Sequence, residues 1–264
     1  MDVPNDLFDL TGRVAVITGG AGHLGRAMAG AFADHGATVA LVDSAADALE
    51  SAAGALPRGQ SAMYVCNLQH DEARSTLAER IKADLGRADV LVNNAAFVGD
   101  SQLTGWVVPF AQQTIDTWRQ AIEVNLTAPF HLSQLFHPML AASGHGSIIN
   151  ISSIYGLLGP DMSLYDGTSM GNPAAYAASK GGLIQLTRWL ATTLAPGVRV
   201  NCITPGGVER GQPEAFSQRY VARTPLKRMA RENDFTGAAT FLASDASAYM
   251  TGQNLIIDGG WSAW

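Results

Sequence analysis

Val14-Ala15-Val16-Ile17-Thr18 runs directly into Gly19-Gly20-Ala21-Gly22-His23-Leu24-Gly25. The apolar, β-branched run predicts a buried strand, and the helical spacing of apolar residues after it predicts a helix. The pattern G-x-G-x-x-G between them permits a tight turn and lets backbone N–H groups approach a pyrophosphate. The pattern alone is weak in a chain with 28 glycines, but the flanking strand and helix favour a dinucleotide site over a plain β–α turn.

The same alternation of strand and helix continues along the chain. Strands are predicted at Val14–Thr18, Thr38–Val42, Ala62–Cys66, Val90–Val92, Ser147–Ile151, Val198–Ile203 and Asn254–Ile257, and helices at Leu24–Asp34, Ala45–Gly54, Glu72–Leu85, Ile115–Leu140, Ala174–Leu194, Glu214–Thr224 and Asn233–Leu242. The strand runs are apolar throughout, which fits a parallel sheet covered on both faces. The chain is therefore predicted to be α/β: a single-domain Rossmann fold over residues 1–264, with a doubly wound, parallel, seven-stranded sheet flanked by helices.

The composition excludes several classes of protein. The 264 residues are 47% hydrophobic and 15% charged, with a formal net charge of −6, which argues against a disordered chain and against nucleic acid as a partner. No apolar run reaches the ~18 residues that a membrane span needs, and Met1–Asp9 is too acidic and polar for a secretory signal. The histidines show no spacing with Cys or Asp typical of a metal site. We expect a cytoplasmic protein with no metal and no membrane partner.

An acidic residue, Asp43, ends the second predicted strand about 20 residues after the glycine turn, where a carboxylate can accept both hydroxyls of an adenosine ribose. The same carboxylate would repel a 2′-phosphate, and Ser44-Ala45-Ala46 offers no cation to offset it. Arg26, the nearest basic residue, is expected to face solvent or a neighbouring element. The sequence therefore favours NAD over NADP.

A second signal is Tyr176-Ala177-Ala178-Ser179-Lys180 on a predicted helix. Residues four apart share one helix face about 6 Å apart along the axis, so the ammonium can lie beneath the phenol. An ordinary tyrosine has a pKa near 10, and a fixed cation beside it favours the phenolate, which suits it to proton transfer. The alternative is a core tyrosine beside a surface lysine.

At these residues the sequence resembles the short-chain dehydrogenase/reductase family, over about residues 9–260. The resemblance rests on seven motifs in order: Thr18-Gly19 to Gly25, Asn93-Asn94-Ala95-Ala96, Asn125 within Val124-Asn125-Leu126, Ser152-Ser153, Tyr176 to Lys180, Pro205-Gly206, and Asp258-Gly259-Gly260. Each motif is individually weak, and the ordered set is highly specific.

The resemblance implies hydride transfer between a secondary alcohol or ketone and a nicotinamide. Tyr176 would be the general acid/base, Ser153 would hydrogen-bond the carbonyl oxygen, Lys180 would lower the Tyr176 pKa and bind the nicotinamide ribose, and Asn125 would hold a water in the proton relay. Ser152 would support the backbone. The implied cofactor contacts are Gly19, Gly22, His23, Leu24, Gly25, Asp43, Asn67, Leu68, Asn94, Ala95, Ala96, Tyr176, Lys180, Pro205, Gly206 and Val208.

The chain departs from the family pattern at four cofactor positions. His23 replaces the usual middle glycine, Ala96 replaces a glycine, Asn67 stands where aspartate is more usual, and Arg210 stands where a carboxamide-binding threonine is common.

Ser153 and Tyr176 are 23 residues apart, more than is typical of the family, and the extra residues 157–173 are rich in hydrogen-bonding groups. We expect 157–173 and 205–224 to be substrate loops or lids, with Ser153, Tyr155, Tyr165 and Arg210 contacting the substrate; a solvated loop or a subunit contact is the alternative. A polyhydroxylated substrate needs such a polar wall. The predicted function is NAD-dependent oxidation of a secondary hydroxyl on a sugar, sugar acid or polyol.

Two alternatives stay open: a 3-oxoacyl or other ketone reductase that uses NADPH, and a non-catalytic dinucleotide-binding sensor. The presence of Ser153, Tyr176, Lys180 and Asn125 together argues against the sensor. Trp118 and Trp189 are expected in the core or at an interface. Trp261 and Trp264 are expected to be exposed at the C-terminus, and because two exposed tryptophans would be unusual on a monomer, a homotetramer or homodimer is expected.

Overall fold

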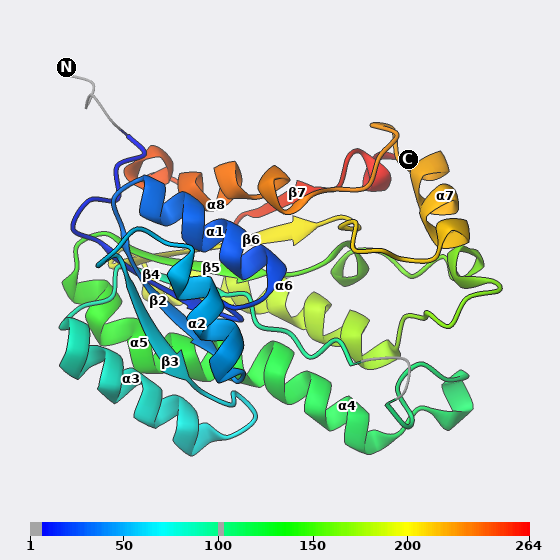
Figure 1. Cartoon of the computed structure of the whole chain (residues 1–264), viewed down its shortest axis with the longest axis horizontal. Coiled ribbons are helices and arrows are strands. Elements are labelled where there is room, and N and C mark those ends of the chain that lie inside the picture. Colours follow the sequence, from blue (N-terminus) through cyan, green and yellow to red (C-terminus); the bar gives the residue numbers. More distant parts are fainter. Residues whose placement is uncertain (1–6, 100–102) are drawn as a thin grey trace.

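Seven parallel strands form one sheet in the computed structural model, which describes residues 7–99 and 103–264 (Figure 1). The strands are β1 (Val14–Thr18), β2 (Thr38–Asp43), β3 (Ser61–Val65), β4 (Val90–Asn93), β5 (Gly146–Ile151), β6 (Val198–Pro205) and β7 (Asn254–Ile257). Their order is β3-β2-β1-β4-β5-β6-β7, so the single-domain Rossmann architecture is confirmed. Most of the acidic stretch Met1–Asp9 lies outside the described residues.

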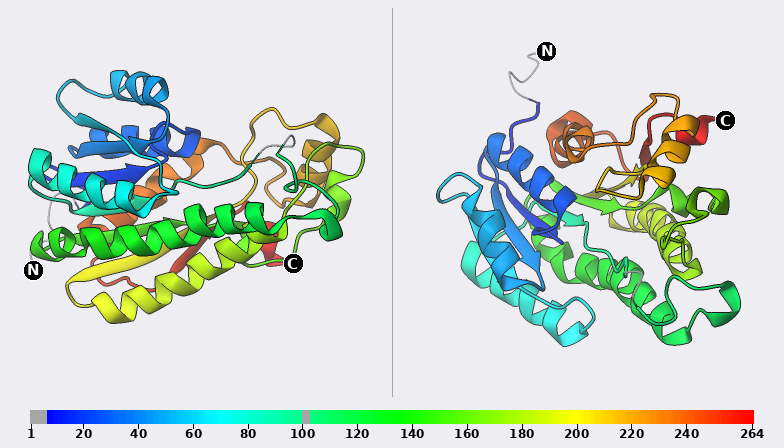
Figure 2. Two further views of the ribbon diagram at one scale, coloured as in Figure 1. Left: turned by 90° about the horizontal axis from the view of Figure 1, so that it is seen from below. Right: turned by 45° about the vertical axis from the view of Figure 1, so that its right-hand side comes forward.

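Helices cover both faces of the sheet (Figure 2). They are α1 (His23–Asp34), α2 (Ala46–Gly54), α3 (Asp71–Leu85), α4 (Ile115–Ile122), α5 (Ala128–Ala142), α6 (Ala174–Leu194), α7 (Glu214–Arg223) and α8 (Thr236–Ala243). Apolar side chains of α1, α2 and α8 form one core cluster with the sheet, and those of α3, α5 and α6 form a second. Strands buried on both faces explain why their sequences are apolar throughout.

The order in which the chain adds strands to the sheet reverses at β1. This strand pairs with β2 on one side and with β4 on the other. Ligands of doubly wound sheets bind at such a switch point, beyond the carboxyl ends of the strands. The glycine turn after β1 and the segments after β4 and β5 therefore meet at one edge of the sheet.

The helix predicted over Ile115–Leu140 is interrupted. A π-helical turn, Glu123–Thr127, separates α4 from α5. Pro129, the second residue of α5, lacks the N–H that an α-helix would direct at the carbonyl of Asn125. The missing donor gives a physical reason for the changed winding at Asn125. Single 3₁₀ turns occupy Phe110–Gln112, Ile154–Gly156, Met162–Tyr165, Glu232–Asp234, Asp245–Ser247 and Trp261–Ala263.

The segment 157–173, α7 and the C-terminus lie together at one end of the molecule (Figure 1). Tyr165, Phe216, Tyr220 and Trp261 pack as one aromatic cluster there. Trp261 stacks on Tyr220 with ring centroids 4.3 Å apart and is 7% exposed, so the prediction of an exposed Trp261 was wrong. The error arose because the sequence did not reveal that α7 folds over the C-terminus.

Candidate active site

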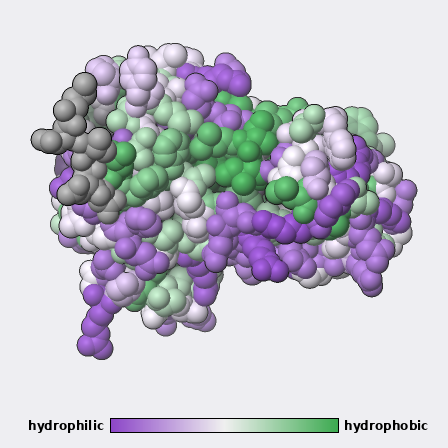
Figure 3. Space-filling view, turned by 90° about the horizontal axis from the view of Figure 1, so that it is seen from above, coloured by the Kyte–Doolittle hydropathy of each residue, from purple (hydrophilic) through white to green (hydrophobic). Residues whose placement is uncertain are grey.

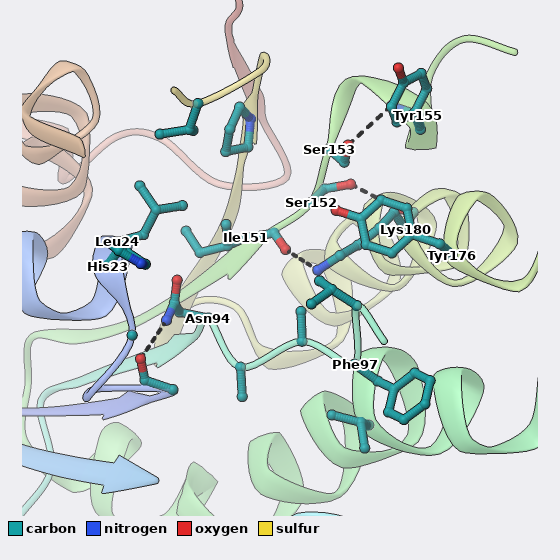
Figure 4. A pocket seen from close by; sticks show the side chains of 18 of the residues that line it. His23, Leu24, Asn94, Phe97, Ile151, Ser152, Ser153, Tyr155, Tyr176 and Lys180 are labelled. Atoms are coloured by element: carbon teal, nitrogen blue, oxygen red, sulfur yellow. Dashed lines mark hydrogen bonds between the residues drawn. The ribbon is translucent and has the colours of Figure 1, made fainter. Parts of the chain in front are cut away.

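A cavity of about 670 Å³ lies at the carboxyl ends of the strands (Figure 4). It is lined by all but two of the residues singled out from the sequence: Gly19, Gly22, His23, Leu24, Asp43, Asn67, Leu68, Asn94, Ala95, Ala96, Ser153, Tyr155, Tyr165, Tyr176, Lys180, Pro205, Gly206, Val208 and Arg210. Gly25 and Asn125 are not among the lining residues. One continuous cavity thus joins the glycine turn to the Tyr176–Lys180 pair.

The glycine turn after β1 is shaped by two glycines. Gly19 has φ +62°, a left-handed conformation that other residues rarely adopt. A side chain at Gly25 would collide with the carbonyl oxygen of Gly19, so Gly25 lets α1 begin directly against the turn. At the start of α1, Gly22 is the N-cap and provides no side-chain cap. The first N–H groups of this helix are therefore available to an anion, which fits a dinucleotide pyrophosphate.

Thr18 and Asn94 hold the turn in place. Thr18 Oγ1 accepts hydrogen bonds from the backbone N–H groups of Asn94 and Ala95, both at 3.1 Å. The Asn94 amide donates to the carbonyl oxygens of Thr18 and Gly19 at 2.9 and 3.0 Å (Figure 4). Asn94 thus lines the cavity while its side chain braces the glycine turn.

Asp43 ends β2 beside this turn. Its Oδ2 accepts from the N–H of Ala21 at 3.2 Å, and its Oδ1 accepts from the N–H of Ser44 at 2.8 Å. Arg26 donates to the carbonyl oxygens of Ala21 and Ala48 and to Ser51 Oγ, so its guanidinium is committed to α2 and the turn. Among the described residues that line the cavity, the Arg and Lys side chains are Arg210 and Lys180, which belong to its other end.

Tyr176 and Lys180 occupy successive turns of α6 and face the segment after β5. The Lys180 Nζ donates to the carbonyl oxygen of Ile151 at 2.8 Å and lies 5.9 Å from the centroid of the Tyr176 ring (Figure 4). Ser153 lines the same cavity and is near enough to Tyr176 to lower the pKa of its hydroxyl. The three side chains predicted from scattered motifs therefore meet at one point.

Burial controls the titration of this cluster. It raises the pKa of Tyr176 above its ordinary value, while Ser153 and the charge of Arg210 lower it. Burial also lowers the pKa of Lys180 to about 8. The sequence predicted a lowered Tyr176 pKa; the direction here is upward, because the loss of hydration outweighs the nearby charge.

Ser152 and Asn125 serve the scaffold in this structure. The Ser152 hydroxyl donates to the carbonyl oxygen of Lys180 at 2.9 Å. The Asn125 Oδ1 accepts from the N–H of Phe97, and its Nδ2 donates to the Phe97 carbonyl and to Ser179 Oγ. Both side-chain N–H bonds of this buried residue are therefore used within the chain, and its role as the holder of a relay water stays a prediction.

At the end of the cavity that holds Tyr176, Tyr155 and Tyr165 share a hydrogen bond of 2.7 Å between their hydroxyls. The Arg210 Nε lies 3.6 Å from Glu232 Oε1, so this guanidinium is paired within the chain. Asn172 also lines the cavity, although the sequence had marked it only as part of a polar stretch.

Other lining residues were missed. Trp106 reaches the cavity from outside every predicted site segment. Gln212, Phe216 and Tyr220 lie in 205–224, which was predicted as a substrate loop, but they were not among the predicted site residues. Asp161, Ser163 and Thr168, expected in a polar substrate wall, instead hydrogen-bond within residues 157–173. Over the ranges 7–99 and 103–264, no group of three or more His, Cys, Asp or Glu side chains is arranged to hold a metal ion, and no helix is long and apolar enough to cross a membrane.

A glycine turn, a strand-end aspartate and a Ser–Tyr–Lys cluster on one Rossmann cavity define a dinucleotide-dependent oxidoreductase, and comparisons with known proteins agree. The family model described as Enoyl-(Acyl carrier protein) reductase matches residues 19–262. The probable galactose dehydrogenase GalD of Rhizobium meliloti is 38% identical over 271 residues, covering 98% of this chain and 99% of its own. The 3-oxoacyl-[acyl-carrier-protein] reductase FabG of Thermotoga maritima is 35% identical over 261 residues, covering 95% and 98%.

Among solved structures, a short-chain dehydrogenase from Leptospira borgpetersenii with bound NAD+ has a TM-score of 0.85 and 30% identity, covering 99% of this chain and 97% of its own. The chain belongs to the short-chain dehydrogenase/reductase family. Its relatives include sugar-acting dehydrogenases and ketoreductases.

Proposed function

We propose that this protein is an NAD-dependent dehydrogenase that interconverts a secondary alcohol and a ketone on a sugar, sugar acid or polyol. The observation that carries the proposal is the single cavity that joins the open N-terminus of α1 and Asp43 to Ser153, Tyr176 and Lys180. A cofactor bound along this cavity would bring its nicotinamide to the Ser–Tyr–Lys cluster.

The choice of NAD rests on Asp43. Its carboxylate lies where it can accept the ribose hydroxyls, and it would repel a 2′-phosphate. Arg26, the cation nearest in sequence, makes three hydrogen bonds to backbone and Ser51 and is not free to neutralise a phosphate. The other proposed cofactor contacts are the residues that were predicted from the sequence and that also line the cavity. Gly25 does not line it and would act by shaping the glycine turn.

In the oxidative direction, bound NAD+ supplies the acceptor for the hydride that leaves the carbinol carbon. Tyr176, as phenolate, takes the hydroxyl proton, and the C–O single bond becomes the carbonyl. Ser153 donates a hydrogen bond to the same oxygen as its charge changes. Lys180, held by Ile151, adds a positive charge beneath the phenol and holds the nicotinamide ribose. Asn125 positions Phe97 and Ser179 around this cluster.

The substrate class rests on the polar groups beyond Tyr176. Tyr155, Tyr165 and Asn172 come from residues 154–173, and Arg210 from the start of 205–224, the two segments that we propose as substrate loops. Uncharged hydrogen-bonding groups in a partly apolar cavity favour a substrate with several hydroxyls. The name of the GalD relative points the same way.

A 3-oxoacyl or other ketone reductase using NADPH is the second candidate, favoured by the FabG relative. The test is absorbance of the reduced nicotinamide across sugars, sugar acids, polyols and 3-oxoacyl thioesters, with NAD(H) and NADP(H) in parallel. Turnover of a polyhydroxylated compound with NAD supports the proposal, and turnover confined to acyl ketones with NADPH overturns it.

Tyr176→Phe separates an enzyme from a non-catalytic sensor. The variant should lose turnover by ~100-fold or more while still binding NADH. Unchanged turnover would overturn the mechanism. A cytoplasmic location and a homotetramer or homodimer complete the proposal.

A further inference from the structure

Two tyrosines from different parts of the loop after β5 meet in the cavity. The Tyr155 and Tyr165 hydroxyl oxygens are 2.7 Å apart, and both residues line the cavity that holds Tyr176. Tyr155 lies two residues after Ser153, and its N–H donates to Ser153 Oγ at 3.2 Å (Figure 4). The tyrosine pair therefore lies beside the group that would contact the reacting oxygen.

A count of protons shows what the pair offers to a ligand. Two phenols carry two protons, and their mutual hydrogen bond uses one of them. Whichever tyrosine donates, one O–H remains as a donor, and free lone pairs remain as acceptors. Burial raises the pKa of both phenols, so both stay protonated and uncharged at neutral pH.

Asn172 adds a second polar group at the same place. It lines the same cavity and acts to lower the pKa of Tyr165, and its Oδ1 is buried without a hydrogen-bond partner among the described residues. A buried acceptor without a partner is unfavourable, and a donor from a ligand would satisfy it. An O–H group can donate to this carbonyl and accept from the phenol at once.

The loop that carries Tyr165 is fixed from outside the cavity. Arg219 on α7 donates to the carbonyl oxygens of Leu164 and Asp166 at 3.3 and 2.6 Å. Arg223, one helical turn later, pairs with Asp161. The Tyr165 ring packs on Phe216 with centroids 5.4 Å apart. The tyrosine pair is therefore preorganised before any ligand binds, which reduces the entropy lost on binding.

We propose that Tyr155, Tyr165 and Asn172 form a subsite for an uncharged hydroxyl of the substrate, next to the hydroxyl that is oxidised. This inference rests on the proposed alcohol–ketone function and deepens it, because it requires at least two hydroxyls on the substrate. The extra residues between Ser153 and Tyr176 would then contribute to substrate specificity, because they carry Tyr165 and Asn172.

The test pairs side-chain variants with deoxy substrates. Tyr155→Phe, Tyr165→Phe and the double variant are assayed on the best substrate of the panel and on its monodeoxy analogues, with exposed Tyr249→Phe as the control. On the full substrate, each single variant should lose about 10-fold in kcat/KM. The loss in kcat/KM of the double variant should be much smaller than the two single-variant losses multiplied together, because the two hydroxyls act as a unit. On the analogue that lacks the bound hydroxyl, the same variants should lose less than ~2-fold.

Equal losses on every analogue, or no loss on any, would overturn the subsite. NADH binding, measured by fluorescence, should stay unchanged and shows that the variants fold. A wild-type protein that oxidises no hydroxyl compound would overturn the proposed function instead. In that case calorimetry with D-galactose on the NADH complex decides the subsite: binding weakened in Tyr155→Phe supports it, and absent or unweakened binding overturns it.

Discussion

The ammonium of Lys180 donates to the carbonyl oxygen of Ile151 at 2.8 Å, and this bond fixes the charge beneath Tyr176. Lys180 is 2% exposed and enclosed by β5, β6 and its own helix, where burial lowers its pKa to about 8. The last residue of β5 thus anchors the cation that the proposed chemistry of Tyr176 requires.

Lys180→Met should therefore abolish most activity without unfolding the protein. The variant keeps the apolar stem and removes the charge, so kcat should fall by ~100-fold or more. Stability offers an independent readout. A lysine whose pKa falls from its ordinary value to about 8 on folding makes folding less favourable below pH 8, and this penalty is relieved as pH rises through the window between 8 and the unfolded pKa. Denaturant unfolding should show that rise in the wild type and a weaker one in Lys180→Met. An equal rise in both would contradict the assignment.

Arg210→Gln should move the pH profile of alcohol oxidation towards alkaline pH. The positive charge of Arg210 lowers the pKa of Tyr176, so its removal should raise that pKa further. Oxidation needs the phenolate, and the rising limb of kcat/KM against pH should therefore appear at higher pH. Arg210→Lys keeps the charge and is the control. Because Arg210 is partly exposed, added salt should reduce the difference between the two variants. A shift of the kcat/KM profile of Arg210→Gln towards acid pH would contradict this effect of Arg210 on Tyr176.

Several large apolar side chains support the proposed oligomer. Trp118 on α4 and Trp189 on α6 are 40% and 54% exposed. Hydrophobic residues also gather midway along the face seen in Figure 3. Ile256 on β7 is 46% exposed. Light scattering during gel filtration should give a mass of two or four times the 27.8 kDa of one chain. Ile256→Asp or Trp189→Glu should shift it towards a smaller species, and a wild-type monomer at every concentration would refute the prediction.

The strands were predicted to within about two residues because they are apolar runs bounded by polar residues. The limits of α6 were predicted correctly for a related reason: Pro173 precedes the helix and Pro196 follows it. The break at Glu123–Thr127 was missed, since Pro129 in that sequence still permits a continuous helix with a kink. Periodicity detects an element, whereas a change of winding depends on local hydrogen bonds.

The candidate site, like the fold, was predicted only in part from the sequence. Gly19 and Asp43 were predicted because each lies at the end of a predicted strand. Tyr176 was predicted from its spacing to Lys180, and Ser153 from the resemblance to the short-chain dehydrogenase/reductase family. Trp106, Asn172, Phe216 and Tyr220 were not assigned to the site. Phe216 and Tyr220 lie on α7, which docks on residues 157–173 through Arg219 and Arg223, a tertiary contact without a signal in the sequence. Trp106 reaches the cavity from a separate cluster with Phe97.

Asp43→Ala should weaken NAD binding and remove the preference over NADP. The carboxylate would have two tasks, because it accepts from the N–H groups of Ala21 and Ser44 and is also the proposed partner of the adenosine ribose. Asp43→Asn keeps an oxygen acceptor for the turn and removes the negative charge. If repulsion of the 2′-phosphate decides specificity, both variants should gain about 10-fold or more in the NADP/NAD ratio of kcat/KM. Only Asp43→Ala should also weaken the glycine turn, seen as a lower melting temperature. Loss of activity with both cofactors at an unchanged ratio would show that Asp43 serves the turn alone, and the cofactor assignment would then fail.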